Sequence, residues 1–546
     1  MNKLNKLLCG IVITICANSH ASELILRNVS LVDVVSLQIY SERTLVIVGN
    51  EIVKISDNTY QSQIEDSISI DMTGKYVIPG LIDAHVHHAT DPDSWDNYAV
   101  TKQRLQHLLR GGVTSVRDMG GDARALANLK RLAEIDQIQS PDIFFSVIIG
   151  GEAFFADPRT VSSAKGRVPG ETPWMRAVDL DSDFDSVILQ AKGIGATGIK
   201  VYNGVPSEVL PPLYQSTKKH GLKIWSHATI SPASPMDSVV AGVNVLSHVP
   251  DLAGEVIDNM RDWRIGEFEI SDALFQSSLQ QSSYTELLTA MHEKHVVLDA
   301  TMTVFESRKN DNPLRRKVYE QAKFILSLAV ESGVKVGAGT DAFADLEVDL
   351  LPPLHEELEL LVDEGGMSPL QAIQSASIIN AQAIGIEDTH GSVEAGKVAN
   401  LVFLSEDPSV NISHSKSIVH VMKNGKFMYR GNMPNLPFVS AREVDGMLWM
   451  SGQLGNFPTT MTLAGDSIEA QMHQTLSNIG DVLREYDLGY NDVVKCTLML
   501  ADINEWSRAN EVYKQYFTDQ LPTRSAFGAS GLALNAKVEV ECIAER

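Results

Sequence analysis

The chain has 546 residues, of which 44% are hydrophobic, and its formal net charge is −24. This length and apolar content predict about two to four domains with well-filled cores. The negative field repels nucleic acid and anionic membranes, so we expect a small-molecule substrate rather than either of those partners.

The first 21 residues have the pattern of a secretory signal peptide. Lys3 and Lys6 precede a short apolar run over 7–17, and Ser-His-Ala at 19–21 is a small-x-small cleavage sequence. The run is too short to span a bilayer, so we expect no stable membrane anchor and a periplasmic or secreted protein. Two cysteines follow the leader, Cys496 and Cys542. We expect buried thiols, although a single bridge is also compatible with the sequence.

Short apolar stretches with turn signals follow over 22–77 and return over 388–430. Gly49-Asn50 and Asn424-Gly425 are typical of tight hairpin turns. Two small β-rich pieces that flank a long middle segment suggest one small β-sandwich assembled from both.

The middle segment, 78–387, alternates strand and helix patterns, with helices expected at positions such as 98–109 and 122–135. The candidate strands cover 78–86, 113–118, 142–149, 197–202, 222–227, 243–248, 295–303 and 334–340. Eight such units favour an α/β fold with a closed (β/α)8 TIM barrel over an open doubly wound sheet. No Gly-x-Gly-x-x-Gly follows the first strand, which also counts against a nucleotide-binding sheet.

Metal-binding residue types stand at the ends of several of these strands, each after a short apolar or β-branched run. They are His85, His87, Lys200, His227, His248 and Asp341. The carboxyl ends of barrel strands form the active site of this fold. His85 and His87 share one face of their strand because side chains alternate with a period of two. We therefore predict a site for two divalent ions, with zinc favoured.

Lys200 is the diagnostic residue of this set. A lysine that faces metal ions inside a barrel is desolvated and repelled, which lowers its pKa, and a neutral amine can take up carbon dioxide to form a carbamate. We expect carboxylated Lys200 to bridge a first ion, held by His85, His87 and Asp341, and a second ion, held by His227 and His248. A bridging hydroxide then attacks an amide carbon, and Asp341 carries its proton to the leaving nitrogen.

The sequence around these residues resembles the amidohydrolase superfamily over about 23–430. The matching runs are Pro-Gly-Leu-Ile-Asp-Ala-His-Val-His-His, Ser-Val-Arg-Asp-Met-Gly-Gly, Gly-Thr-Asp-Ala and Gly-Ser-Val-Glu-Ala-Gly-Lys-Val-Ala-Asn-Leu-Val. Ile-Lys-Val-Tyr and Leu-His-Glu-Glu-Leu-Glu-Leu-Leu resemble its imidazolonepropionase-like and Xaa-Pro dipeptidase-like branch. The resemblance implies two zinc-like ions, a carboxylated lysine, and hydrolysis of a dipeptide, an N-acyl amino acid or a cyclic amide. Tyr202 and His355 are candidate substrate contacts or, equally, packing residues.

A linker with two prolines at 431–437 precedes a compact α+β module at 438–546. Strands are expected at 447–451, 493–500 and 537–544, and helices at 468–486 and 505–516. Met-Ser-Gly-Gln-Leu-Gly, Asp-Val-Val-Lys-Cys-Thr-Leu-Met-Leu and Leu-Pro-Thr-Arg-Ser-Ala resemble the RidA family of enamine and imine deaminases, which has a chorismate-mutase-like fold.

That second resemblance implies a carboxylate-binding Arg524, a Glu539 that holds the attacking water, and Ser451 and Asn510 in the same pocket. It also implies a homo-oligomer, a trimer with the pocket between subunits. Phe438 stands where the family often has tyrosine, and Ala526 where it often has cysteine.

Two other functions stay open at this point. The module could be degenerate, so that the protein binds a carboxylate metabolite without converting it. The barrel could be a metal-dependent deaminase of a ring carbon, although such relatives often use one ion and lack the bridging lysine.

Overall fold

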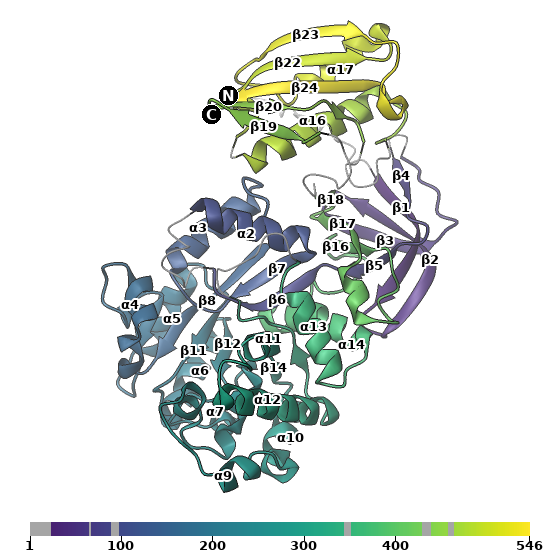
Figure 1. The fold of residues 1–546 in the computed structure, drawn as a ribbon. Coiled ribbons are helices and arrows are strands. Elements are labelled where there is room, and N and C mark those ends of the chain that lie inside the picture. The colour runs from purple at the N-terminus through teal and green to yellow at the C-terminus, as the bar shows by residue number, and fades with distance from the viewer. Residues whose placement is uncertain are drawn as a thin grey trace, which may run out of the picture.

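The computed structural model describes residues 23–64, 67–88, 98–342, 351–428, 438–456, 463–486 and 488–546. These residues form three β-sheets, and each sheet has a hydrophobic core of its own (Figure 1). The expected signal peptide and the linker at 431–437 lie outside the described residues. Among the helices of the described part, none has the length and apolar character needed to cross a membrane.

The first sheet joins the two β-rich pieces expected from the sequence. Its eight strands are β1 Glu23–Asp33, β2 Gln38–Val48, β3 Glu51–Asp57, β4 Ile68–Asp71, β5 Tyr76–Pro79, β16 Leu401–Leu404, β17 Ile418–Lys423 and β18 Lys426–Phe427. The two pieces meet where β5 runs antiparallel to β16, with Ile78 opposite Val402. The expected sandwich is thus one continuous hydrogen-bonded sheet. Both hairpin predictions, at Gly49-Asn50 and Asn424-Gly425, are confirmed.

The second sheet contains the barrel. Its parallel strands are β6 Leu81–Val86, β7 Val113–Asp118, β8 Asp142–Gly150, β11 Gly198–Val201, β12 Lys223–His227, β13 Val245–Ser247, β14 Val297–Asp299 and β15 Val336–Gly337, and the short β9 Glu171–Thr172 and β10 Met175–Ala177 add to its edge. The ring closes where Ala84 N donates to Ala338 O at 3.1 Å and His87 N donates to Ala342 O at 3.1 Å. The predicted eight-stranded barrel is confirmed.

Two predicted strands differ from the observed ones. The stretch 78–86 divides at Gly80, where a side chain would clash with Thr114. Its first part is β5 of the first sheet, and the rest is β6 of the barrel. The stretch 295–303 ends early, because the Glu357 carboxylate accepts the N–H groups of Met302 and Thr303 and starts a helix there.

Helices cover the outside of the barrel (Figure 1). They are α2 Tyr98–Arg110, α3 Ala123–Glu134, α4 Pro158–Ala164, α5 Phe184–Gly193, α6 Leu210–Lys219, α7 Pro235–Ala241, α8 Met260–Ile265, α9 Asp272–Ser277, α10 Thr285–Glu293, α11 Met302–Glu306, α12 Pro313–Glu331, α13 Leu354–Asp363, α14 Pro369–Gln374 and α15 Asn380–Ile384. In α12 the buried residues Val318, Ala322, Ile325 and Ala329 recur at helical spacing, which fixes the face turned to the core.

The C-terminal domain is the α+β module expected from the sequence. It consists of β19 Ala441–Val444, β20 Met447–Met450, β21 Gln453–Leu454, α16 Ile468–Glu485, β22 Val493–Leu500, α17 Trp506–Tyr513, β23 Thr523–Gly528 and β24 Val538–Glu545, in the sheet order β19-β20-β24-β22-β23 with β21 on β24. Burial alternates along β22 and β24, so one face of this sheet packs on the helices.

The two cysteines of this domain form a disulfide, with an S–S distance of 2.02 Å. Cys496 on β22 lies directly opposite Cys542 on β24, and both point to the buried face. The expectation of two free thiols was therefore wrong. The pairing depends on the register between strands far apart in the sequence, which the sequence alone does not reveal.

Candidate active site

Four imidazoles meet at the carboxyl ends of the barrel strands. His85 and its neighbour His87 belong to the end of β6, His227 ends β12, and His248 follows β13. The ring centroid of His85 lies 5.3 Å from that of His87 and 4.9 Å from that of His248, and the centroid of His248 lies 4.7 Å from that of His227. These predicted ligands therefore form one continuous group.

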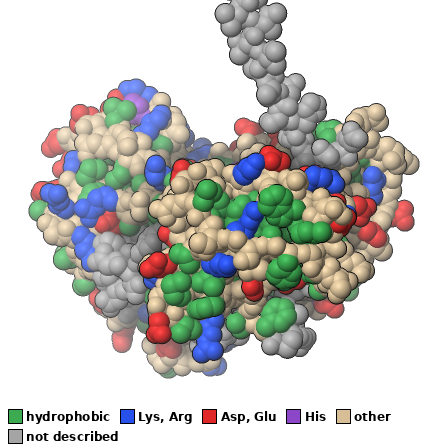
Figure 2. Space-filling view, turned by 90° about the horizontal axis from the view of Figure 1, so that it is seen from above, with side chains coloured by type: hydrophobic (Ala, Val, Ile, Leu, Met, Phe, Trp, Pro, Cys, Tyr) green, Lys and Arg blue, Asp and Glu red, His purple; other side chains and the backbone are tan. Residues whose placement is uncertain are grey.

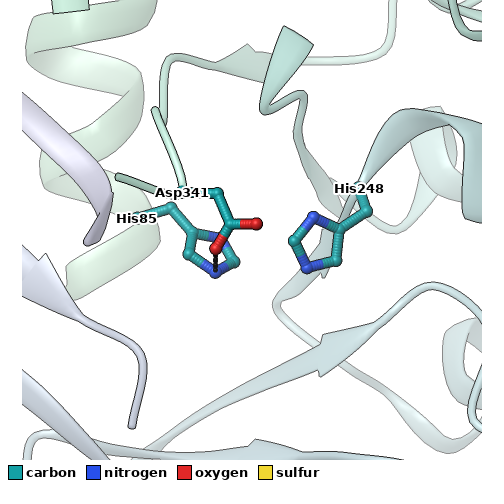
Figure 3. A group of neighbouring side chains, drawn as sticks. All are labelled: His85, His248 and Asp341. Carbon is teal, nitrogen blue, oxygen red and sulfur yellow. Dashed lines mark ion pairs between the residues drawn. The ribbon is translucent and has the colours of Figure 1, made fainter. Parts of the chain in front are cut away.

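Asp341 joins this group from the segment after β15. Its Oδ1 lies 3.4 Å from Nε2 of His85 and 3.1 Å from Nε2 of His87. His85, His248 and Asp341 each offer a ligand atom, and these atoms lie within 4.8 Å of one another (Figure 3). Asp341 and His248 both have positive φ angles, 51° and 72°, a strained backbone that is typical of functional sites.

The protonation states of these side chains suit metal binding. Burial lowers the pKa of His85 to about 4 and holds the pKa of His248 well below its usual value, so both rings are neutral near pH 7. Burial raises the pKa of Asp341, but its interactions with His85, His87 and His248 outweigh that effect and hold the pKa well below its usual value. Nε2 of His85 is buried and makes no hydrogen bond. A divalent ion fits this set of nitrogen and oxygen donors.

A buried carboxylate that the sequence analysis did not single out supports the group. Asp299, at the end of β14, accepts hydrogen bonds from His85 Nδ1 at 2.7 Å, from Arg117 Nη2 at 2.9 Å and from Ser247 Oγ at 2.9 Å. Because an ionised carboxylate only accepts, Nδ1 of His85 carries the proton and Nε2 faces the ligand group. The apolar run before Asp299 is the same signal that identified the other strand ends.

Lys200 lies in the same polar network. Its side chain is fully buried, and its Nζ donates to Ser247 Oγ at 2.6 Å, which in turn donates to Asp299. Burial lowers the pKa of Lys200 to about 7. A large fraction of this amine is therefore neutral near physiological pH.

The group faces a cavity of about 910 Å³, whose lining includes His87, His227, His248 and Asp341. Tyr202 forms part of the wall. Its ring stacks on Phe154 with centroids 4.9 Å apart, and its hydroxyl donates to Met119 O at 2.8 Å. Tyr202 is thus placed where a substrate contact was expected.

His355 is not among the residues that line this cavity. It is fully buried on α13, where its Nε2 donates to Gly111 O and its Nδ1 lies near Ser415 Oγ, both at 2.9 Å. Both ring nitrogens join α13 to neighbouring segments, which favours the packing role that the sequence left open beside substrate contact.

The C-terminal candidates do not all converge within one chain. Arg524 is opposite Cys496 in the β22–β23 register, so it lies on the helix side of the sheet, with its guanidinium 4.6 Å from the ring of Tyr513. Glu539 is opposite Met499, three residues further along β22, and so lies on the other face. Burial raises the pKa of Glu539.

Two further residues were expected in that pocket. Ser451, just after β20, donates from its Oγ to Val439 O at 2.6 Å. Asn510 lies on α17, the helix that also carries Tyr513, and its Oδ1 is buried. One copy of the domain therefore holds only part of a pocket that uses both Arg524 and Glu539.

Comparison with known proteins identifies both parts. The model of the amidohydrolase family matches residues 76–428. The chain belongs to the amidohydrolase family. The barrel of this amidohydrolase is similar to a solved Xaa-Pro dipeptidase with bound methionine (TM-score 0.58, 22% identity, 74% of this chain and 99% of that one) and to A. niger ochratoxinase (TM-score 0.57, 20% identity, 74% and 95%). At these identities the likeness establishes the shared fold.

The remainder, residues 431–546, matches a second family model, described as Endoribonuclease L-PSP. Over 108 residues, 20% of the amidohydrolase chain, it is 40% identical to the chloroplastic Reactive Intermediate Deaminase A of Arabidopsis thaliana and to the 2-iminobutanoate/2-iminopropanoate deaminase of Bos taurus. The match spans 58% of the first protein and 79% of the second. The C-terminal domain is thus a RidA domain.

Replacing Asp299 tests how far the site depends on this buried carboxylate, which supports the group of histidines. We expect Asp299→Asn to weaken metal binding by about 10- to 100-fold, because the neutral amide replaces the charged acceptor that orients His85 and makes its ring more basic. The variant also leaves the buried Arg117 without its carboxylate, at a cost of about 3–5 kcal/mol of stability. Metal affinity is measured by competition with a chelator, and stability by urea unfolding.

The double variant Arg117→Met/Asp299→Asn separates the two effects. It removes the unpaired charge, so stability should recover while metal affinity stays low. Wild-type metal affinity in either variant contradicts the positioning role of Asp299.

Proposed function

We propose that the barrel is a two-metal hydrolase that cleaves a carbon–nitrogen bond in a dipeptide, an N-acyl amino acid or a cyclic amide. The single observation that carries this proposal is the group of four imidazoles with Asp341 at one end of a cavity large enough for such a substrate. One of the solved proteins that share this fold is a Xaa-Pro dipeptidase, which supports an amide substrate.

His85, His87 and Asp341 would hold one ion, and His227 and His248 the other. Zinc is the ion we favour, since neutral imidazoles and a carboxylate are its usual partners. Ions bound in such sites polarise a carbonyl group and make water more acidic. Asp341, kept ionised by the surrounding histidines, accepts the proton of the attacking water and delivers it to the leaving nitrogen.

Lys200 would complete the site as a carbamate. Its neutral amine adds to carbon dioxide, a nitrogen–carbon bond forms, and one proton is released. The carbamate replaces the buried amine with a group that carries two oxygens and one negative charge. The cationic Arg117 and the ions would offset that negative charge. The lowered pKa of Lys200 supports this step, because it makes the nucleophilic amine available near neutral pH.

Metal content tests this assignment. We expect about two ions per chain in protein loaded with zinc in bicarbonate buffer, and one or none in Lys200→Ala. Uptake of the bridged pair should rise with pH through about 7, where the Lys200 amine loses its proton. The measurement is elemental analysis after gel filtration.

Lys223→Ala is the matched control, because Lys223 begins β12 at the other end of a neighbouring strand and donates to Gln382 O. This control should keep both ions. Equal metal content in wild type and Lys200→Ala contradicts the carbamate bridge, and a single ion in the wild type favours a ring deaminase.

The RidA domain, we further propose, hydrolyses an imine to a keto acid and ammonia, in a pocket shared by neighbouring copies of the chain in a trimer. Arg524 would bind the substrate carboxylate and Glu539 would hold the attacking water. The opposite orientation of these two residues within one sheet supports a shared pocket. The sheet of the domain also exposes large hydrophobic side chains, including Trp449 at 53% and Phe527 at 48%. Hydrophobic side chains gather on the face of the molecule that Figure 2 shows.

Mixed oligomers test the shared pocket. Chains with Arg524→Ala or Glu539→Gln should each lose turnover of 2-iminopropanoate generated in the assay. Co-expressed in equal amounts, they should recover about a quarter of wild-type activity, since one pocket in four receives Arg524 and Glu539 from intact positions. Ammonia release above the spontaneous rate is the readout. No recovery, or a monomer by light scattering, contradicts a pocket between copies.

Export is the last part of the proposed function. The leader pattern over 1–21 and a disulfide in the C-terminal domain both fit an oxidising compartment outside the cytoplasm. We expect the mature protein to be recovered from the periplasm or the medium with Ser22 as its first residue, by N-terminal sequencing. A cytoplasmic protein with an intact leader contradicts this.

A further inference from the structure

The cavity that contains the imidazole group has a second polar feature, a wall of arginines. Arg264 on α8, Arg308 just after α11 and Arg315 in the first turn of α12 all line it, together with His227, His248 and Asp341. The lining also carries Asp262 and Glu267, so these arginines form a local cluster of cations rather than an excess of positive charge over the whole cavity. We call these three residues the arginine wall.

Arg264 anchors the wall. Its Nε lies 3.0 Å from Oδ1 of Asp251, a carboxylate that is only 1% exposed. Its guanidinium also lies 5.7 Å from the centre of the Phe305 ring. Arg264 is thus neutralised and held in place without a ligand.

Arg308 and Arg315 have no such partner. Within the part of the chain that the structure describes, no carboxylate oxygen lies within 4 Å of either guanidinium, although Asp262 and Glu267 also line the cavity. Burial, and after it the charges of Arg308 and Arg264, lower the pKa of Arg315. Like charges held together beside a cavity are unfavourable, and an anionic ligand would relieve that cost.

A fourth arginine on the lining is already satisfied. Arg159 is held by Asp157, with Nη2 to Oδ2 at 2.8 Å and Nε to Oδ1 at 3.1 Å. Its charge is therefore paired, and among the described residues of the lining the arginines without a carboxylate within 4 Å are Arg308 and Arg315. Two unpaired guanidiniums match two carboxylates, because each fork of N–H groups can hold one carboxylate by both oxygens.

We propose that the arginine wall binds an acidic amino acid residue of the substrate, so that the barrel acts on dipeptides or N-acyl amino acids that contain aspartate or glutamate. One guanidinium takes the side-chain carboxylate and the other the main-chain carboxylate, while the amide bond lies toward Asp341. This substrate class rests on the proposed amide hydrolysis. The cavity, at about 910 Å³, is lined by residues of both features and has room for a substrate of this size.

Matched substrate pairs test the wall. We would compare kcat/KM of the zinc-loaded full-length protein for Ala-Glu against Ala-Gln, and for Glu-Ala against Gln-Ala, which differ by one charge at nearly constant shape. The wild type should prefer the glutamate member of at least one pair by about tenfold or more, mainly through KM. In Arg308→Gln/Arg315→Gln this ratio should fall to about one.

Arg316→Gln is the control, since it removes the same charge from the same turn of α12. Arg316 is not on the cavity lining, and its guanidinium binds Asn310 Oδ1 at 2.8 Å. This variant should keep the wild-type ratio. Hydrolysis with a ratio near one in the wild type, or a ratio that the double variant leaves unchanged, overturns the inference but leaves amide hydrolysis standing.

If none of the four dipeptides is hydrolysed, the dipeptidase form of the proposed function fails, and binding decides the inference separately. The probes are then N-acetylglutamate and N-acetylglutamine, titrated into the zinc-loaded protein by calorimetry. Binding of the glutamate compound alone, lost in Arg308→Gln/Arg315→Gln and kept in Arg316→Gln, supports the wall. Equal binding of the two compounds, or no binding of either, overturns it.

Discussion

The buried negative charge of Asp299 is the interaction on which the interior of the barrel depends. A carboxylate in this position is costly unless it is paired, and burial by itself raises its pKa. His85 and then Arg117 and Lys200 outweigh that effect and hold the pKa of Asp299 to about 2. In return, Asp299 orients His85 and, through Ser247, the amine of Lys200. Four residues from separate strands are thus arranged around one charge.

The strained backbone at the site is explained by the same network. His248 and Asp341 have positive φ angles, which cost about 1–3 kcal/mol each for residues other than glycine. The backbone N–H of His248 donates to the carbonyl of Asp299 at 2.9 Å, and that of Asp341 donates to the carbonyl of His85 at 2.8 Å. Both strained residues are therefore held by backbone hydrogen bonds to Asp299 and His85, which are themselves linked through the Asp299 carboxylate. The fold itself therefore fixes the backbone of both residues.

Much of this barrel could be predicted from the sequence because a parallel barrel brings the carboxyl ends of its strands together. An apolar run followed by a histidine or aspartate therefore identified His227, His248 and Asp341 without any knowledge of the contacts between them. Asp299 carries the same signal, but the run 295–303 was interpreted as one strand that continued past it. That strand ends because of Glu357, a residue of a distant helix that the local pattern does not reveal.

Other details could not be predicted because they depend on which segments face each other. The sequence left His355 open between substrate contact and packing, and the hydrogen bond to Gly111 O, a residue far away in the sequence, favours packing. The Cys496–Cys542 bridge follows from the register of β22 and β24. The strand registers of the same sheet separate Arg524 from Glu539, which motif resemblance alone does not reveal.

This separation gives the two halves of the chain different requirements. Every ligand group proposed for the barrel comes from one chain, since the strand ends that carry them surround a single cavity. The RidA domain exposes its groups on two faces of one sheet, so a pocket that uses both needs a second copy. The proposed C-terminal chemistry therefore depends on the proposed assembly, whereas the barrel site is built by the internal pairing of its own charges.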